Sequence, residues 1–284
     1  MNNLRSGLPG GIMEHDLSPD AFNASRIPLS GALGDFLGAG STAPEDARRE
    51  LMALVDEHVD AGSGVLVGFS RLLGEMLPQD NEGTQVRVVR DRGTAIGEGA
   101  RARYSDSRFG GNLHTDGAEA PLPAPELFTL LCTRQADVGG ALELIHLRDI
   151  VAALSDQPDV LDTLRAHFHF DRRGDQPEGE SPTVRKPVIF EQGGRAAITH
   201  LRSYIEKGHA HPPVPDLSAA QLHALDTLDA VIASDEHPRT GKLRPGELAL
   251  FDNLSLLHGR TEFQDEPDRS RLLLLLRTWI RRSG

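Results

Sequence analysis

The segment FGGNLHTDG, residues 109–117, places a histidine and an aspartate two positions apart between glycines. In an extended chain, residues i and i+2 point to the same face, so the His114 imidazole and the Asp116 carboxylate can approach one ion together. Both groups are ordinary ligands of divalent transition metals. The glycines at 110, 111 and 117 allow a close approach of backbone and ligand. This segment therefore predicts half of a metal site, with a polar surface pair as the alternative.

The same His-x-Asp pattern occurs twice more, so spacing alone does not decide the site. His58-Val59-Asp60 falls in a predicted helix, 44–62, where residues two apart point to different faces and cannot share one ion. His169-Phe170-Asp171 falls in a predicted strand and could chelate a metal. It runs into Arg172-Arg173, which we interpret as part of an exposed loop whose positive charge opposes a bound cation. The sequence favours the pair at 114 and 116.

A third ligand is expected in PGELALFDNLSLLHGRTEF, residues 245–263. A predicted strand ends there at Asn253, and His258 follows it. Taken alone, His258 would more often be a polar loop residue. The next strand, RLLLLLRTWI (271–280), strengthens the case for a ligand, because it carries charge among its leucines.

Arg271 stands on this otherwise apolar strand, and a buried charge is very costly without a partner. One suitable partner is an anionic ligand, because a planar guanidinium matches a carboxylate. Arg277, further along the same face of the strand, could serve the same pocket.

Two histidines and one carboxylate on one face of an ion are typical of non-haem Fe(II) oxygenases. Zinc is the main rival metal, but a catalytic zinc site usually keeps a single open position. An arginine placed to bind a dicarboxylate favours Fe(II) with 2-oxoglutarate as co-substrate and O2. Two alternatives stay open: a metal-binding protein without oxygenase activity, and a zinc-dependent hydrolase with Glu119 as its base.

Composition narrows the class of protein. The chain has 284 residues, of which 38% are hydrophobic and 25% charged, as in a globular protein. Its net charge of −12 argues against nucleic-acid binding, because phosphate contact needs a positive surface. No stretch approaches the ~20 apolar residues that span a bilayer, and no signal peptide is evident. The single cysteine, Cys132, suits a reducing compartment, so we expect a cytoplasmic protein.

Short strands separated by Gly and Pro turns predict a sandwich or barrel rather than a parallel sheet. Residues 1–43 form an expected irregular arm without periodicity. Helices are predicted at 44–62, 148–166 and 217–234. Strands are predicted at 64–69, 84–91, 126–135, 141–147, 167–171, 186–192, 195–201, 246–253 and 271–280.

Several of these motifs together resemble the taurine dioxygenase-like (TauD/TfdA) family of Fe(II)/2-oxoglutarate-dependent oxygenases. They are LHTDG (113–117), the later Gly139-Gly140, FDN (251–253), HGRT (258–261), and Arg271 with RTWI (277–280). The resemblance covers about residues 64–280 in order, and its specificity lies in the combination.

The resemblance implies a mixed α+β fold with a double-stranded β-helix, or jelly roll, over 64–280. Flanking helices and a helical insertion at about 148–240 complete a single catalytic domain of residues 1–284. It implies that His114, Asp116 and His258 bind iron and that Arg271 binds the far carboxylate of 2-oxoglutarate. Arg269 stands at the shorter spacing of some members and is the second candidate for that role.

The sequence departs from the family at one position. Members often carry a threonine for 2-oxoglutarate after the Gly-Gly turn, whereas here Ala141-Leu142 follows. Halogenating members lack the iron carboxylate, so Asp116 favours hydroxylation. Desaturation and cyclisation would use the same residues.

The substrate is expected to be a polar amino acid or an amino-acid-derived natural-product intermediate, either free or tethered to a carrier protein. Sulfonate or aryloxyacetate oxidation is the alternative. The expected substrate contacts carry both signs of charge, as a zwitterion requires, and ordinary polar surface is the competing interpretation. These candidates are Asp106, Arg108, Arg202, Glu206 and Arg277. The sequence carries no indication of oligomeric state.

Overall fold

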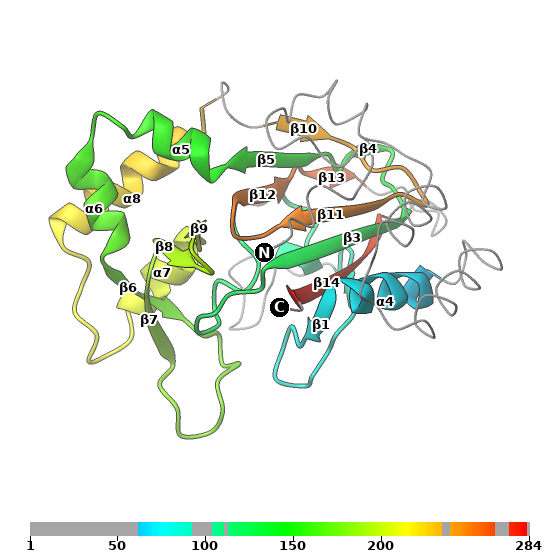
Figure 1. Cartoon of the computed structure of the whole chain (residues 1–284), viewed down its shortest axis with the longest axis horizontal. Coiled ribbons are helices and arrows are strands. Elements are labelled where there is room, and N and C mark those ends of the chain that lie inside the picture. The colour runs from blue at the N-terminus through cyan, green and yellow to red at the C-terminus, as the bar shows by residue number, and fades with distance from the viewer. Residues whose placement is uncertain (1–61, 93–103, 111–112, 235–238, 265–272, 283–284) are drawn as a thin grey trace.

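Strand β14 (Leu274–Arg282) lies at the centre of the larger of the two main antiparallel sheets, of five and three strands; three two-stranded sheets are also present among the described residues. The computed structural model describes residues 62–92, 104–110, 113–234, 239–264 and 273–282, and Figure 1 shows their arrangement. Strands β1 (Gly74–Leu77) and β2 (Arg87–Val89) pair along one edge of β14. Strand β3 (Leu127–Arg134) pairs along the other edge, and β11 (Leu248–Asp252) continues the sheet beyond it.

The smaller sheet has the order β10 (Arg239–Gly241), β5 (Leu142–His146) and β12 (Leu256–Arg260). Beside it, β4 (Val138–Gly139) pairs with β13 (Phe263–Gln264). One buried apolar cluster joins Phe128 and Trp279 of the larger sheet to Leu144 and Leu256 of the smaller one. The two sheets therefore pack against each other through their apolar faces.

Strand alternation places two polar side chains in the space between the sheets. On β12, Leu256 belongs to the inter-sheet cluster and Leu257 to a separate one, so His258 points the same way as Leu256. On β14, Leu275 and Trp279 belong to the inter-sheet cluster, and Arg277 lies between them on the same face. His258 and Arg277 thus point into the interior because side chains alternate between the two faces of a strand.

The segment between β5 and β10 builds a second layer with its own core, on the left of Figure 1. Its core includes Ile150, Leu164, Phe168 and Leu225, each fully buried. Helix α8 begins at a capping box, in which the Ser218 hydroxyl accepts from the Gln221 N–H at 3.2 Å. The elements are α5 (Leu147–Ala153), α6 (Pro158–Arg165), β6 (His167–Asp171), β7 (Thr183–Pro187), β8 (Ile189–Gln192), β9 (Arg195–Ile198), α7 (Arg202–His209) and α8 (Ala219–Ile232).

The strand predicted at 64–69 is wrong, because these residues lie in helix α4 (Gly62–Leu73). The buried side chains of α4 are at helical rather than alternating spacing: Val65, Leu66, Phe69 and Leu73. A six-residue apolar window is too short to separate a strand from a helix. Helix α4 covers the outer face of β14, where Leu66 packs with Leu276.

The other predicted elements have their counterparts, with shifted bounds. The strand predicted at 186–192 is two strands, β7 and β8, separated at Val188. Helix α7, strands β1 and β12 and the short 3-10 helix η2 (Tyr104–Asp106) were not predicted. The predicted arm at 1–43, most of the predicted helix 44–62 and the pair at 58 and 60 lie outside the described residues. No helix in the described part of the chain is long and apolar enough to cross a membrane.

Candidate metal centre

His114 and His258 are joined through their backbones by an isolated antiparallel bridge. The His114 N–H donates to the His258 carbonyl at 2.9 Å, and the His258 N–H donates back at 2.8 Å. Residues directly opposite in such a bridge project their side chains to the same face. The two imidazole centroids accordingly lie 4.5 Å apart.

Asp116 is held by the fully buried side chain of Asn253, at the end of β11. The Asn253 Oδ1 accepts from the Asp116 N–H at 2.9 Å, and the Asn253 Nδ2 donates to the Asp116 carbonyl at 3.0 Å. The same Nδ2 also donates to the Pro125 carbonyl at 2.9 Å. Gly117 follows with a φ of 73°, and a Cβ there would lie 2.8 Å from the Pro125 ring. The turn after Asp116 therefore requires glycine.

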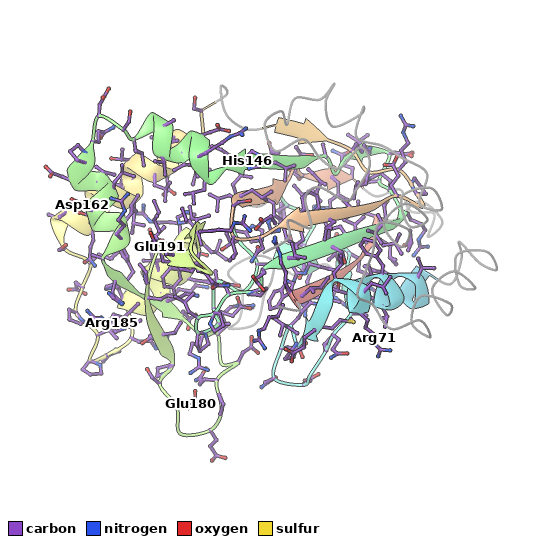
Figure 2. The ribbon with its side chains drawn as sticks, in the orientation of Figure 1. Arg71, His146, Asp162, Glu180, Arg185 and Glu191 are labelled. Atoms are coloured by element: carbon purple, nitrogen blue, oxygen red, sulfur yellow. The ribbon has the colours of Figure 1, made fainter. Side chains whose placement is uncertain are left out.

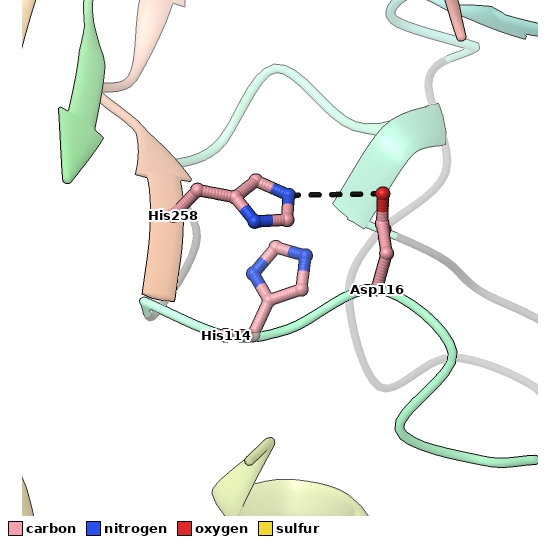
Figure 3. A group of neighbouring side chains, drawn as sticks. All are labelled: His114, Asp116 and His258. Atoms are coloured by element: carbon pink, nitrogen blue, oxygen red, sulfur yellow. Dashed lines mark ion pairs between the residues drawn. The ribbon is translucent and has the colours of Figure 1, made fainter. Parts of the chain in front are cut away.

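The two oxygens of the Asp116 carboxylate have different surroundings. Oδ1 accepts from the Arg277 Nη1, whereas Oδ2 is buried without a hydrogen-bond partner among the described residues. Oδ2 faces the His258 Nε2 at 3.9 Å, as drawn in Figure 3. One ligand atom from each of His114, Asp116 and His258 lies within 4.8 Å of the others. A buried carboxylate oxygen without a donor, facing two imidazoles, fits a divalent cation.

His258 is set in an apolar wall. Its ring lies 4.2 Å from the Phe128 ring, which stacks on Phe251 at 4.6 Å. Burial, with the neighbouring His114 and Arg277, holds the pKa of His258 well below its usual range. The imidazole is therefore neutral near pH 7, which is the protonation state that a metal ligand needs.

Arg277 is itself fixed by a buried partner. Its Nε donates to the Gln79 Oε1 at 2.9 Å, and the Gln79 Nε2 donates to the Arg277 carbonyl at 2.9 Å. Its guanidinium carbon lies 5.1 Å from the Trp279 ring centroid. The contacts of Arg277 thus orient the carboxylate of Asp116, as partners of metal ligands commonly do.

A pocket opens beside His114 and Asp116. Its wall also contains residues from five parts of the chain: Ser105, Glu119, Arg173, Leu201, Tyr204 and Trp279. Glu119, expected as the base of a zinc hydrolase, is therefore close to the centre. Arg173, expected in an exposed loop, is only 5% exposed and lies in the wall instead.

Of the five expected substrate contacts, Arg277 lies in the pocket wall and the other four are not among its described lining residues. Asp106 accepts from Arg87 and Arg92, at 2.7 and 2.9 Å. The exposed Arg108 lies over the Phe109 ring at 5.4 Å.

The charges of Arg202 and Glu206 are paired with each other on helix α7, at 2.8 Å. Arg202 also contacts Asp226 and Asp229 of α8 at 2.9 Å. The opposite charges seen in the sequence at these positions are therefore used in ion pairs, two of which connect helix α7 to helix α8. Arg269 and Arg271 lie outside the described residues.

The competing pair at 169 and 171 does not form a metal cluster. Among the described residues, the group at 114, 116 and 258 is the one arrangement of three or more such side chains able to hold an ion. The His169 Nδ1 lies 3.2 Å from the Thr183 hydroxyl. Asp171 instead accepts from the backbone N–H of Arg173 at 3.1 Å.

Lys186 ties the helical layer to the loop that follows Asp116. Its Nζ donates to the Ala120 carbonyl at 2.6 Å and lies 4.8 Å from the Phe170 ring centroid. Burial lowers the pKa of Lys186 to about 7, and the Glu119 carboxylate opposes this shift. Ser105 and Tyr204 of the pocket wall lie within the two stretches, 104–108 and 202–206, that supplied four of the expected substrate contacts. The sequence carried no such signal for Arg173, because an arginine among charged neighbours usually indicates surface.

Comparison with known proteins adds a family. The profile of the taurine catabolism dioxygenase TauD, TfdA family matches residues 41–279. FR-33289 synthase of Streptomyces rubellomurinus (strain ATCC 31215) is 29% identical over 225 residues, 78% of this chain and 64% of that protein. Uridine-5'-phosphate dioxygenase of Streptomyces sp is 30% identical over 167 residues, 57% of this chain and 58% of that protein. The chain thus spans less than two thirds of the length of either relative.

Solved structures of oxygenases share the fold. Asparagine oxygenase in complex with Fe(II), 2S,3S-3-hydroxyasparagine and succinate superposes with a TM-score of 0.60 at 24% identity, covering 92% of this chain and 82% of that one. The non-heme iron oxygenase OrfP in complex with Fe and alpha-ketoglutaric acid superposes with a TM-score of 0.55 at 18% identity, covering 77% and 64%.

Replacing Asn253 by alanine should damage both stability and the metal centre. The change leaves three buried backbone groups without their partner, at about 1–3 kcal/mol each. We expect a loss of at least about 3 kcal/mol in the free energy of unfolding and weaker Fe(II) binding. Urea unfolding and anaerobic Fe(II) titration measure the two effects. Ser255→Ala, in the same turn, is the control, and equal behaviour of the two variants would contradict this role for Asn253.

Lys186 should make stability depend on pH. Its pKa is about 7 in the folded protein and ordinarily 10.5, so between these values the unfolded chain binds more protons and stability rises with pH. The cost of burying the charge is greatest below pH 7 and disappears as pH approaches 10.5, at about 1.4 kcal/mol for each pKa unit.

Lys186→Met should therefore lack this rise, as urea unfolding between pH 7 and 9.5 would show. Lys207→Met, at an exposed position of α7, should keep the wild-type rise. If the free energy of unfolding changed with pH in the same way in the wild type and in Lys186→Met, Lys186 would not be the cause of the pH dependence.

Proposed function

Because the chain belongs to the taurine catabolism dioxygenase TauD, TfdA family, whose members are Fe(II)/2-oxoglutarate-dependent dioxygenases, we propose that it hydroxylates an unactivated C–H bond of a small polar substrate. The proposed substrate is an amino acid or an amino-acid-derived intermediate, either free or tethered to a carrier protein. The co-products are succinate and CO2. The observation that carries this proposal is the buried Oδ2 of Asp116, facing His258 beside His114.

The proposed iron ligands are His114, Asp116 and His258. O2 would be the oxidant, and bound Fe(II) with 2-oxoglutarate would activate it: the decarboxylation of 2-oxoglutarate to succinate and CO2 would supply two of the electrons that O2 takes up, and the substrate C–H bond the other two. The chain's own residues hold the site: Arg277 occupies one oxygen of Asp116 and leaves the other for the ion. The low pKa of His258 keeps its imidazole unprotonated. Phe128 and Trp279 line the centre with apolar surface, which limits the access of water.

We assign the far carboxylate of 2-oxoglutarate to Arg271, with Arg269 as the second candidate. The support is the family spacing from His258 and the carboxylate-matching geometry of a guanidinium. Members of the family often carry a threonine after the Gly-Gly turn, where this chain has Ala141. Thr261, in the motif HGRT, lies beside this position: its hydroxyl accepts from the Ala141 N–H at 3.0 Å.

The two facing sheets support a finer description of the fold. We propose that they are the two halves of a double-stranded β-helix over residues 64–280, and that the helical layer at about 148–240 is an insertion within a single catalytic domain. The antiparallel order of both sheets is compatible with this arrangement.

A zinc-dependent hydrolase is the second candidate, because Glu119 lies in the pocket wall where a base would be needed. The two functions differ spectroscopically. Only the oxygenase should give a visible metal-to-ligand charge-transfer band when Fe(II) and 2-oxoglutarate are mixed with the protein under anaerobic conditions.

Alanine substitution of each proposed ligand should abolish this band and succinate formation. His114→Ala, Asp116→Ala and His258→Ala each remove a direct contact of the ion. His169→Ala is the control, because its imidazole contacts Thr183 instead. Loss of iron binding in the His169 variant, with retention in the His114 variant, would identify the other pair as the ligands.

Arg271→Ala should weaken 2-oxoglutarate binding by about 2–5 kcal/mol, as expected for removing one side of a buried charge pair. Arg269→Ala should have a much smaller effect. Titration of the anaerobic band with 2-oxoglutarate measures both variants. The reverse order of effects would transfer the role to Arg269.

A further inference from the structure

Arg173 enters the pocket from the helical layer, opposite the sheets that carry the metal centre. It is 5% exposed and shares the pocket wall with His114 and Asp116. We propose that Arg173 determines substrate specificity by binding an oxyanion of the substrate, a carboxylate, sulfonate or phosphate. The inference rests on the proposed function, because it takes this pocket as the substrate site.

The backbone presents this side chain in a defined way. Arg173 has a φ of 59°, in the left-handed region that side-chain-bearing residues rarely adopt. The Asp171 Oδ1 accepts from the Arg173 N–H at 3.1 Å, and the His211 Nε2 lies 3.1 Å from the same oxygen. Asp171, from the His-x-Asp pattern at 169–171, therefore anchors the backbone of Arg173.

The left-handed backbone conformation at Arg173 directs its side chain away from that of Arg172. Arg172 donates to Glu180 at 2.6 Å, and Figure 2 shows Glu180 on the loop between β6 and β7, pointing away from the body of the protein. Two adjacent arginines thus have different surroundings: Arg172 is half-buried and pairs with an exposed glutamate, whereas Arg173 lies in the pocket wall.

Aromatic stacking orients the guanidinium of Arg173. Its central carbon lies 5.3 Å from the Tyr204 ring centroid. Helix α7, which carries Tyr204, approaches β6 closely: a Cβ at Gly208 would lie 2.2 Å from the His169 carbonyl oxygen. The ring contact and the burial of Arg173 restrict the position of its guanidinium, and the N–H groups of a guanidinium can form a bidentate contact with an oxyanion.

The charges of the pocket divide the roles. Arg277 contacts Asp116 and Gln79, so its guanidinium is engaged at the metal centre. The described pocket wall has two arginines, Arg277 and Arg173, and two carboxylates, Asp116 and Glu119. Of the carboxylates, Asp116 is a proposed metal ligand and Glu119 is not. A substrate with an oxyanion for Arg173 and an ammonium for Glu119 matches this arrangement.

Binding can be measured without turnover, because Trp279 is the only tryptophan of the chain and lies in the pocket wall. Its fluorescence is titrated with L-asparagine, taurine and uridine 5'-phosphate, and with the matched compounds asparaginamide, ethylamine and uridine, which lack the oxyanion. The three anions separate carboxylate, sulfonate and phosphate as the preferred group. The protein is tested as the full chain with and without Fe(II) and 2-oxoglutarate.

The decisive variant is Arg173→Asn, since asparagine tolerates the left-handed conformation; Arg173→Gly is a second replacement that the same φ favours. Arg172→Asn removes the same charge one residue earlier and is the matched control. For the preferred anion we expect at least about 30-fold weaker binding in both Arg173 variants. The control should stay within about twofold, because Arg172 pairs with Glu180 and is not among the described lining residues of the pocket.

Three results would overturn the proposal: no anion binds the wild type better than its matched compound, the Arg173 variants bind the preferred anion normally, or they lose 2-oxoglutarate binding alone. Failure of the proposed function appears separately, as absence of the anaerobic charge-transfer band in the wild type. The fluorescence titration reports on Arg173 in either case.

Discussion

The backbone bridge between His114 and His258 is the contact on which the rest of the centre depends. It joins a loop segment to the edge strand β12 and places two imidazoles on one face of the pair. Asn253, just before β12 in the chain, then fixes the backbone of Asp116 from both sides. These hydrogen bonds to the main chain hold the positions from which the three side chains bring one ligand atom each to within 4.8 Å of the others.

The ion pair between Asp116 and Arg277 shows how the interior accommodates charge. Both side chains are almost fully buried, and each would be costly without the other. Gln79 completes the arginine's contacts from outside β14. One carboxylate oxygen is thereby engaged, and the other has no donor in the described part of the chain, so a bound cation would take the place of the missing donor.

The pocket is shared by two layers with separate cores. The inter-sheet layer carries the candidate metal ligands, whereas the helical layer supplies Arg173 and Tyr204 and, through Lys186, supports the turn after Asp116. The residues proposed for the chemistry and the residue proposed to select the substrate, Arg173, therefore belong to different layers. A change in the helical layer can therefore alter which substrate is bound while the bridge between the two histidines is kept.

The sequence by itself determined the family resemblance, which the match over residues 41–279 confirms, and most strands and the helix at 217–234, because alternation and helical spacing are local properties. It also singled out His114, Asp116 and His258, which the structure brings together. It misassigned 64–69, where the apolar window was short, and it took Arg172-Arg173 as a uniform exposed loop. Only the tertiary structure decided that Arg202 joins two helices, that Asp106 is paired with other arginines, and that Arg173 turns into the pocket. The physical reason is that the partner of a charged side chain lies far away in the sequence, and only folding determines which partner it meets.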